Sequence, residues 1–246
     1  MNPTLLVVCP TRNRPERCRE MLESWIRTVR KRSITYSVHP NASASARCLI
    51  GFETSLALYV DELDPRIDGY RELLCLNLPR DMKVVFGPRL RVPEVYNYFF
   101  NTSKYDYYSD ANDDFIYHTP GWDEKLISVI EQHGGLGMAY GQTRNLPTAA
   151  VWSARSLQAL GYWMPPGFVH QYVDNIHRDL FSMAGQMYYV PEVNTEHRHA
   201  SWGDVPWDEG YTQIYKSPDA VKDAEAYEEW RRTRMAEDLR KLKSAK

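Results

Sequence analysis

Cysteine is scarce in this sequence, and none of the four cysteines forms a C-x-x-C pair. Cys9 falls in an apolar run and Cys18 on the apolar face of an expected helix, so we expect buried free thiols rather than disulfides or a zinc site. Long hydrophobic runs are also missing. None reaches the length of a membrane-spanning helix, and no charged leader precedes an apolar segment. These absences favour a cytoplasmic protein with no membrane span.

An excess of one charge sign is absent too. The chain has 30 Lys and Arg against 32 Asp and Glu, a formal net charge of -2. No global basic field therefore indicates nucleic acid, and no acidic excess indicates disorder. Aromatic residues are abundant, with 17 Tyr and 7 Trp, which suits the binding of sugar rings or bases but equally a Tyr-rich core and rim. The length of 246 residues allows one large domain, or one domain with a tail.

The chain begins with the pattern of a strand, a polar loop and a helix. Thr4–Cys9 is a continuous apolar run of the kind expected for a buried parallel strand. Pro15 fits the first position of a helix, and apolar residues then recur at helical spacing. This order is typical of the first unit of an α/β fold that binds nucleotides.

The remaining pattern predicts a mixed α/β domain over residues 1–216. Further strands are expected at residues 56–60, 83–86, 105–109, 138–140, 149–151, 187–190 and 193–199. Helices are expected at about 93–101, from Pro120 behind a Thr119 cap to Gly134, from Ser153 to Gly161, and at about 172–184. Residues 31–55 give no assignable pattern.

Residues 217–246 differ in kind and predict a charged C-terminal helix. Glu228 with Arg232, and Glu237 with Lys241, are spaced for pairing along a helix. The apolar stripe of this segment is thin. We expect a solvated helix that lies along the body, with a basic strip for a polyanion or a protein partner as the alternative.

A cluster of acids follows the strand expected at 105–109. Asp110, Asp113 and Asp114 lie within five positions, and carboxylates this close repel one another unless a cation lies between them. A polar turn is the alternative, because Asp and Asn are favoured in turns. The cluster predicts a divalent-metal site that uses Asp114 together with Asp113 or Asp110.

A second cluster, Glu196-His197-Arg198-His199, follows 83 residues after Asp114, counted to His197. Residues His197 and His199 alternate along an expected strand, so both point to one face. A single histidine is more often structural, but a pair on one face favours a metal-ligand site.

Four other places carry polar residues that suit a nucleotide or a reaction. The loop Pro10-Thr11-Arg12-Asn13-Arg14 follows the first strand, at the sheet edge where α/β folds bind nucleotides. Asp61 ends the second strand and can either bind a nucleoside or cap a turn. Arg89 follows the third strand, where it either neutralises phosphate or is solvated. Asp174 opens a helix, as its cap or as a general base.

These residues, in this order, resemble the glycosyltransferases of the GT-A fold, close to family 2 and its phage-encoded relatives. The loop at 10–15 is similar to the family's nucleotide loop, and Tyr59-Val60-Asp61-Glu62 to its nucleoside-binding acids. Asn112-Asp113-Asp114 resembles the acidic metal motif, which Pro120-Gly121-Trp122-Asp123 often follows. His170-Gln171-Tyr172-Val173-Asp174-Asn175 resembles the acceptor-side motif, and residues 196–199 the later metal-side motif. The likeness covers residues 4–211.

The resemblance implies a Rossmann-like mixed sheet flanked by helices, and a transferase that moves a sugar from a nucleoside diphosphate, expected to be a UDP-sugar, to a hydroxyl acceptor. It implies that Mn²⁺ or Mg²⁺ binds among Asp110, Asp114, His197 and His199, with Asp113 beside the nucleotide. Asp174 would be the base of an inverting reaction. The acceptor stays open between a hydroxymethylated base in phage DNA, a polysaccharide and a small glycoside. A phage origin would place the protein in the host cytoplasm.

Two departures from the family pattern leave the metal ligands open: Glu62 stands where Asp is common, and Asp110 precedes the acidic motif. The segment between Arg30 and Leu56 is also longer than usual, which indicates an acceptor-specific role.

Two other functions fit the residues. One is a metal-dependent phosphoesterase or nuclease, because clustered Asp with H-x-H also builds two-metal sites. The other is a nucleotide-sugar-binding protein without turnover.

Overall fold

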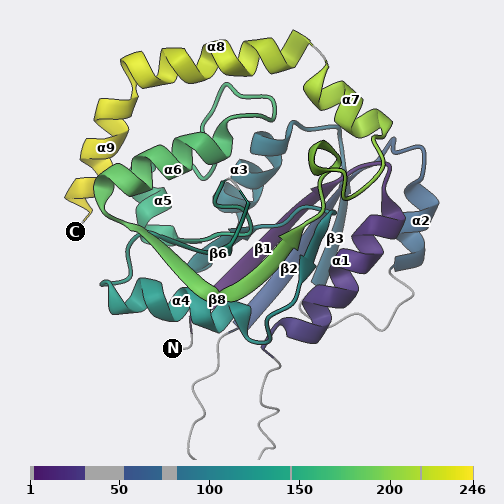
Figure 1. Ribbon diagram of the computed structural model, residues 1–246, viewed down its shortest axis with the longest axis horizontal. Helices are drawn as coiled ribbons and strands as arrows, with labels where there is room; N and C mark the ends of the chain where they lie inside the picture. Colours follow the sequence, from purple (N-terminus) through teal and green to yellow (C-terminus); the bar gives the residue numbers. More distant parts are fainter. Residues whose placement is uncertain (1–2, 31–52, 74–81, 145, 217, 246) are drawn as a thin grey trace, which may run out of the picture.

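The computed structural model describes residues 3–30, 53–73, 82–144, 146–216 and 218–245, and these form a mixed sheet with helices on both faces (Figure 1). The eight strands found in these residues are ordered β3-β2-β1-β4-β7-β6-β8-β5 across the sheet. Their bounds are β1 Thr4–Thr11, β2 Glu53–Asp61, β3 Met82–Gly87, β4 Tyr107–Asp110, β5 Phe115–Tyr117, β6 Met138–Gln142, β7 Val151–Ser153 and β8 Met187–His197. Strands β1 to β4 are parallel, β7 is antiparallel to both neighbours, and β8 is parallel to β6 but antiparallel to β5.

One face of the sheet is covered by α1 (Pro15–Thr28), α2 (Ile67–Leu73) and α4 (Trp122–Gln132). Alternate residues of β1 point to this face, because side chains along a strand alternate between the two sides. Leu5, Val7 and Cys9 accordingly pack with the apolar stripes of these helices, where Trp25 and Trp122 are fully buried. This layer places the carboxyl end of β1 directly before the start of α1.

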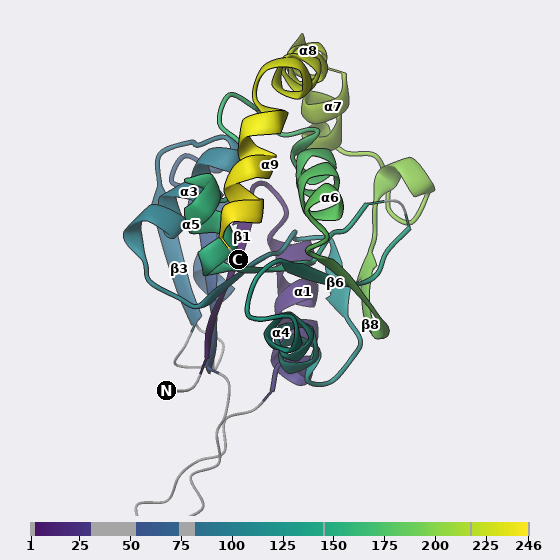
Figure 2. The ribbon, with the colours of Figure 1, turned by 90° about the vertical axis from the view of Figure 1, so that its left-hand side faces the viewer.

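The other face is covered by α3 (Val92–Thr102), α5 (Ala154–Leu160), α6 (Val173–Ala184) and α9 (Met235–Ser244) (Figure 2). Leu6 and Val8 of β1 point to this side. Helix α8 (Pro218–Thr233) runs across the end of the molecule, between α7 (Glu209–Tyr215) and α9 (Figure 1). The short 3₁₀ helix η1 (Ala200–Trp202) follows β8.

The C-terminal segment forms two helices, which meet at Arg234, where one charged helix was expected. Trp230 and Leu242 are buried in the core of the second face, and α9 contacts α5 and α6. The expected Glu237–Lys241 pair is present at 3.0 Å. Arg232, in contrast, pairs with Glu229 rather than with Glu228.

Several boundaries differ from those expected, for local physical reasons. Helix α4 begins at Trp122 instead of Pro120, because Gly121 takes a left-handed conformation (φ 67°) and Thr119 bonds to residues 192 and 194 of β8 rather than capping a helix. The strands expected at 187–190 and 193–199 are one strand that ends at His197.

The strand expected at 149–151 is instead β7, at 151–153, because Ala149 has a positive φ of 51°. The sequence pattern did not predict α2, β5 or α7. Of the unassigned segment 31–55, residues 31–52 lie outside the described residues, and 53–55 begin β2. None of the described helices is long and apolar enough to cross a membrane.

Candidate active site

The loop after β1 is held against the ends of β2 and α2. Arg12 Nε lies 3.3 Å from Asp61 Oδ2, and Asp61 Oδ1 accepts a hydrogen bond from the Leu63 amide. The amide of Asn13, a residue with a positive φ of 59°, donates to Asp64 Oδ2 at 2.7 Å. The structure thus brings Asp61 next to the loop after β1, and Asp64 fixes the backbone of this loop.

The same loop reaches the acidic cluster through Thr11 and Arg14. Thr11 Oγ1 donates to Asp113 Oδ2 at 2.8 Å and lies 2.9 Å from Tyr70 Oη, which accepts from the Arg14 amide. Arg14 Nη1 lies 3.3 Å from Asp113 Oδ1. Burial raises the pKa of Asp113 to about 6, an effect that the Arg14 charge opposes. Asp113, which follows β4, is therefore bonded to two residues of the loop after β1.

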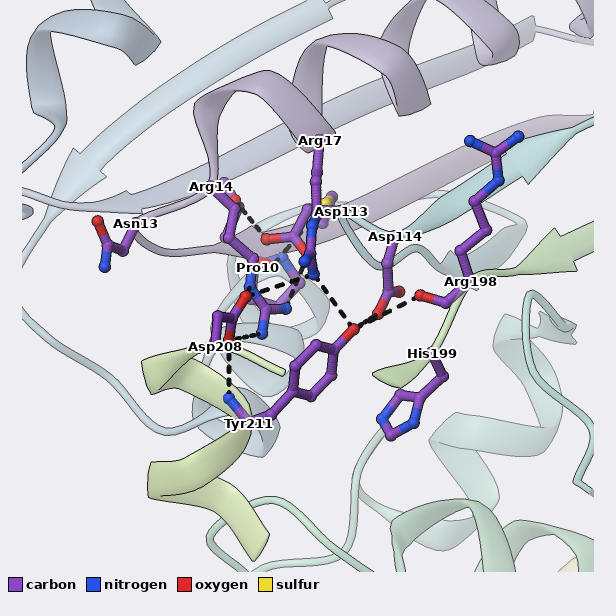
Figure 3. Close-up of polar contacts among 12 residues, drawn as sticks. Pro10, Asn13, Arg14, Arg17, Asp113, Asp114, Arg198, His199, Asp208 and Tyr211 are labelled. Atoms are coloured by element: carbon purple, nitrogen blue, oxygen red, sulfur yellow. Dashed lines mark hydrogen bonds and ion pairs between the residues drawn. The ribbon is translucent and has the colours of Figure 1, made fainter. Parts of the chain in front are cut away.

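Helix α7 closes over this loop (Figure 3). Asp208, the N-cap of α7, accepts from Arg14 Nη2 at 2.7 Å and from Arg14 Nε at 2.9 Å. The ring of Tyr211 lies beneath the Arg14 guanidinium, with Cζ 4.1 Å from the ring centroid. Tyr211 Oη donates to Asp114 Oδ2 at 2.7 Å. Asp208 and Tyr211 are site residues that sequence reasoning missed, and the only local signal was the Asp–Glu–Gly start of a short helix.

Asp114 and His197 are brought together by the pairing of β5 with β8. Phe115 is the register partner of His197, and the Arg198 amide donates to the Asp114 carbonyl at 2.9 Å. His197 Nε2 lies 3.2 Å from Asp114 Oδ1. Although burial raises the pKa of Asp114, the contacts with His197 and Tyr211 outweigh it, so that this pKa lies below its usual value. Asp114 is therefore a buried, ionised carboxylate next to an imidazole.

Two polar atoms of the Asp114–His197 pair make no hydrogen bond within the described part of the chain. Asp114 Oδ1 and His197 Nδ1 are buried without a hydrogen-bond partner among the described residues, since the 3.2 Å contact between the two side chains is not aligned as a hydrogen bond. Buried polar atoms normally have a hydrogen-bond partner, and the binding of an ion is one physical reason for an exception. The described residues contain no ready-made group of three or more metal ligands. A cation here would need further ligands, such as diphosphate oxygens.

His199 has a different environment, although its ring centroid is only 5.3 Å from that of His197. It is the residue before η1, not part of β8. Its Nδ1 accepts from the Ser201 amide at 3.1 Å, and its Nε2 lies 3.0 Å from Tyr215 Oη. Burial and the neighbouring His197 lower the pKa of His199. Both nitrogens of this neutral imidazole are occupied, so His199 supports the segment between η1 and α7.

Asp110 and Asp174 lie close enough to influence each other. Burial, together with the Asp174 charge, raises the pKa of Asp110 to about 8, and Asp110 Oδ1 accepts from the Ala150 amide at 2.9 Å. Burial also raises the pKa of Asp174 to about 6, opposed by His197. Asp110 thus holds the loop before β7 and does not join Asp114 and His197.

Asp174, His197 and His199 line one cavity of about 480 Å³. Its other walls come from the β6–β7 loop, the end of β8 and η1, and they are rich in hydroxyl and amide groups: Gln142, Thr143, Thr148, Asn194, Thr195 and Ser201. Arg144 and Glu196 also line it, and each is already paired, Arg144 with Asp204 and Glu196 with His118. Arg89, expected near the phosphates, is exposed after the edge strand β3 and is not among the residues that line this cavity.

Comparisons with known proteins rest on structure alone. No protein-family model matches the chain, and no curated protein sequence does. A mannosyltransferase from Pyrobaculum calidifontis, solved with GDP-mannose and Mn²⁺, superposes with a TM-score of 0.65 at 12% identity, over 100% of this chain and 74% of that one. The fold is the GT-A glycosyltransferase fold.

TarS of S. aureus is also similar, with a TM-score of 0.53 at 12% identity over 78% of this chain. The match spans only 35% of TarS. Residues 1–349 of TarS in complex with UDP give a TM-score of 0.52 at 12% identity, over 77% of this chain and 58% of that one. The mixed sheet and its helices are therefore an arrangement also found in a mannosyltransferase solved with GDP-mannose and in TarS, a fragment of which was solved with UDP.

Proposed function

We propose that this protein is a metal-dependent glycosyltransferase that moves a sugar from a nucleoside diphosphate to a hydroxyl acceptor. The proposal rests on one observation about the edge of the sheet. There, the loop after β1 bonds to Asp113, and Asp114 lies next to His197. Ligands of α/β folds bind outside the carboxyl ends of the strands, which is where β1 and β4 end here.

The donor would lie between the loop after β1 and the end of β2. Asp61 is placed to accept hydrogen bonds from a nucleoside, and Arg12 and Arg14 can contact phosphate oxygens. We propose a UDP-sugar, because Asp61 follows the pattern of uridine-binding relatives. The mannosyltransferase was solved with GDP-mannose and the TarS fragment with UDP, so the choice between uridine and guanosine is a clear test.

Asp114 and His197 fit a divalent cation held jointly with a diphosphate. One carboxylate, one imidazole and phosphate oxygens suit Mn²⁺, which accepts nitrogen more readily than Mg²⁺ does. When bound, this cation supplies Lewis-acid stabilisation of the charge on the departing diphosphate. Asp114 Oδ1 and His197 Nδ1 have no hydrogen-bond partner among the described residues, which supports this pair as the protein's contribution.

Asp174 is proposed as the general base on the acceptor side. It lines the cavity together with His197, and its pKa near 6 leaves it ionised at neutral pH. In an inverting reaction, the Asp174 carboxylate takes the proton of the acceptor hydroxyl while that oxygen attacks the anomeric carbon of the donor. The bond from this carbon to the diphosphate breaks, and the nucleoside diphosphate leaves.

The lining of the cavity favours a carbohydrate acceptor. Its amides and hydroxyls match sugar hydroxyl groups, and Trp202 adds an aromatic wall. Arg144, the one arginine in the described lining, is paired with Asp204 and is not available to bind a polyanion. The lining also contains two acids, Asp174 and Glu196, which would repel the phosphates of DNA. We therefore propose a polysaccharide or small glycoside ahead of a modified base in phage DNA.

The test is a melting panel followed by turnover. UDP with Mn²⁺ should raise the melting temperature more than GDP with Mn²⁺, and EDTA should remove most of the shift. A UDP-sugar with glycoside acceptors should then give UDP release that depends on the acceptor. If neither nucleotide stabilises the protein with Mn²⁺, the proposed donor site is wrong. Release of UDP without any transfer would favour a hydrolase.

A further inference from the structure

A buried carboxylate of the C-terminal segment holds the loop that leads to Asp174. Asp223 of α8 is 1% exposed. Its Oδ1 accepts from the Val169 amide at 2.7 Å, and its Oδ2 accepts from the amides of His170 at 2.8 Å and Gln171 at 2.7 Å. Three consecutive N–H groups therefore converge on one side chain that lies more than 50 residues later in the chain.

The next residue along this loop is strained and is supported by the same helix. Tyr172, the N-cap of α6, has φ 65° and ψ -4°, a left-handed conformation that bulky residues rarely adopt. Its ring stacks on Tyr227 of α8, with centroids 5.1 Å apart and planes at 22°. Tyr227 Oη also donates to Asp179 of α6 at 2.6 Å. Helix α8 thus contacts both the loop before α6 and the body of α6 (Figure 1).

We propose that α8 positions Asp174, with Asp223 as the principal positioning residue and Tyr227 as the second. Asp174 lies in the first turn of α6, two residues after Tyr172, so that the path of residues 169–172 fixes the direction in which its carboxylate enters the cavity. This inference rests on the proposed function, since it concerns the base of that reaction. It makes the C-terminal segment part of the catalytic unit, although no residue of α8 lines the cavity.

The chain offers a matched control. Asp238 of α9 is also a 1% exposed carboxylate of the C-terminal segment. It accepts from Tyr162 Oη at 2.8 Å and from Trp230 Nε1 at 3.1 Å, and it makes no contact with residues 169–171 in the described hydrogen bonds. A role confined to stability would make the two acids equivalent, whereas a positioning role distinguishes them.

The experiment compares Asp223→Asn with Asp238→Asn. An asparagine keeps the shape of the side chain but replaces one accepting oxygen by an NH₂ donor, so at least one of the three loop amides loses its acceptor. For Asp223→Asn, we expect faster hydrogen exchange at amides 169–171 and a kcat at least about tenfold lower, because small errors in orientation cost rate steeply. The KM for the nucleotide sugar should stay within about twofold, since the donor is bound by other residues. Asp238→Asn should change neither the exchange nor kcat, at a temperature well below its melting point.

Tyr227 carries the test if Asp223→Asn does not fold. Tyr227→Phe keeps the stacked ring, whereas Tyr227→Leu removes it, and only the leucine variant should lower kcat at unchanged donor KM. Wild-type kcat in Asp223→Asn, or an equal loss in Asp238→Asn, would overturn the inference, as would faster exchange at 169–171 with no change in kcat. Absence of transfer by the wild-type protein would instead contradict the proposed function, and the exchange data would still report whether Asp223 holds the loop.

Discussion

Asp208 binds the guanidinium of Arg14 through both carboxylate oxygens, at 2.7 and 2.9 Å, and thereby joins α7 to the loop after β1 across 194 residues of sequence. The same guanidinium lies over Tyr211 and beside Asp113. In this state, the cation best placed to meet a diphosphate is already paired with two acids. If the proposed donor contacts Arg14 through its diphosphate, its binding competes with the contact between Arg14 and Asp208.

The first prediction concerns this competition. Asp208→Asn weakens the hold on Arg14, which should leave the guanidinium freer to contact a diphosphate. Because the pair is partly exposed, we expect only about a two- to fivefold gain in UDP affinity with Mn²⁺, measured by calorimetric titration. Glu209→Gln is the control, since the side chain of Glu209 bonds, among the described residues, to Gln213 of the same helix. Weaker UDP binding in Asp208→Asn would mean that the closed segment helps to hold the nucleotide.

Replacing His197 by alanine should weaken metal binding, whereas replacing His199 by alanine should lower the stability of the fold. His197→Ala removes the imidazole beside Asp114, and we expect Mn²⁺ to bind at least about tenfold more weakly in the presence of UDP. His199→Ala removes a buried ring with two bonded nitrogens. It should cost about 2 kcal/mol in the free energy of unfolding, with little change in metal affinity. Metal titration and chemical denaturation separate the two effects, and the reverse assignment would follow if His199→Ala alone weakened Mn²⁺ binding.

Two acids of the cluster at 110–114 should also respond differently. Asp114→Asn removes the ionised carboxylate, and kcat should fall at least about 100-fold with the fold intact. Asp110 has a pKa of about 8 and accepts from the Ala150 amide. At pH 7 an asparagine there resembles the protonated acid, so Asp110→Asn should keep kcat within about threefold. Full activity of Asp114→Asn in EDTA would exclude the metal role, and a loss in Asp110→Asn equal to that in Asp114→Asn would return Asp110 to the metal site.

The dependence of rate on pH should report Asp174. Burial raises the pKa of Asp174 to about 6, and a general base works only when it is ionised, so activity is present above this pH and is lost as the pH falls through it. Below about pH 6, kcat at saturating donor should fall tenfold per pH unit. Asp174→Asn should lower kcat by about 100-fold or more and remove this limb. A profile that is flat down to about pH 4 would contradict the role of Asp174.

Much of the fold could be predicted because its signals are local. The apolar run of β1, the helical spacing after Pro15, and the Ser153 cap and Gly161 stop of α5 all appear where their patterns indicated. Three short elements, β5, α2 and α7, escaped prediction, because their three to seven residues show no clear periodic pattern and are held by tertiary contacts. The start of α4 was misjudged, since a left-handed Gly121 precedes it.

The site divides in a similar way. Thr11 and Asp61 end β1 and β2, and Asp113 follows the end of β4. The parallel pairing of β1 with β2 and β4 brings these residues to one edge of the sheet, as their positions in the sequence indicated. Tyr211 and Asp208 could not be found in this way, because their partners are in the loop after β1 and after β4. The sequence placed His197 and His199 on one face of a strand but left open which of them would bind a metal, because the partners of His199 come from η1 and α7.

The pairing of Phe115 with His197 joins two strand ends that are separated by some eighty residues of chain. A contact of such long range closes a large loop of the chain. The chain must lose the conformational entropy of this loop before the acid and the imidazole become neighbours. A slip of one residue in this three-residue pairing would place Glu196 or Arg198 opposite Phe115, so β5 sets the identity of the group beside Asp114. Cation affinity should consequently appear only once this pairing has formed, and it offers a sensitive reporter of correct folding for this chain.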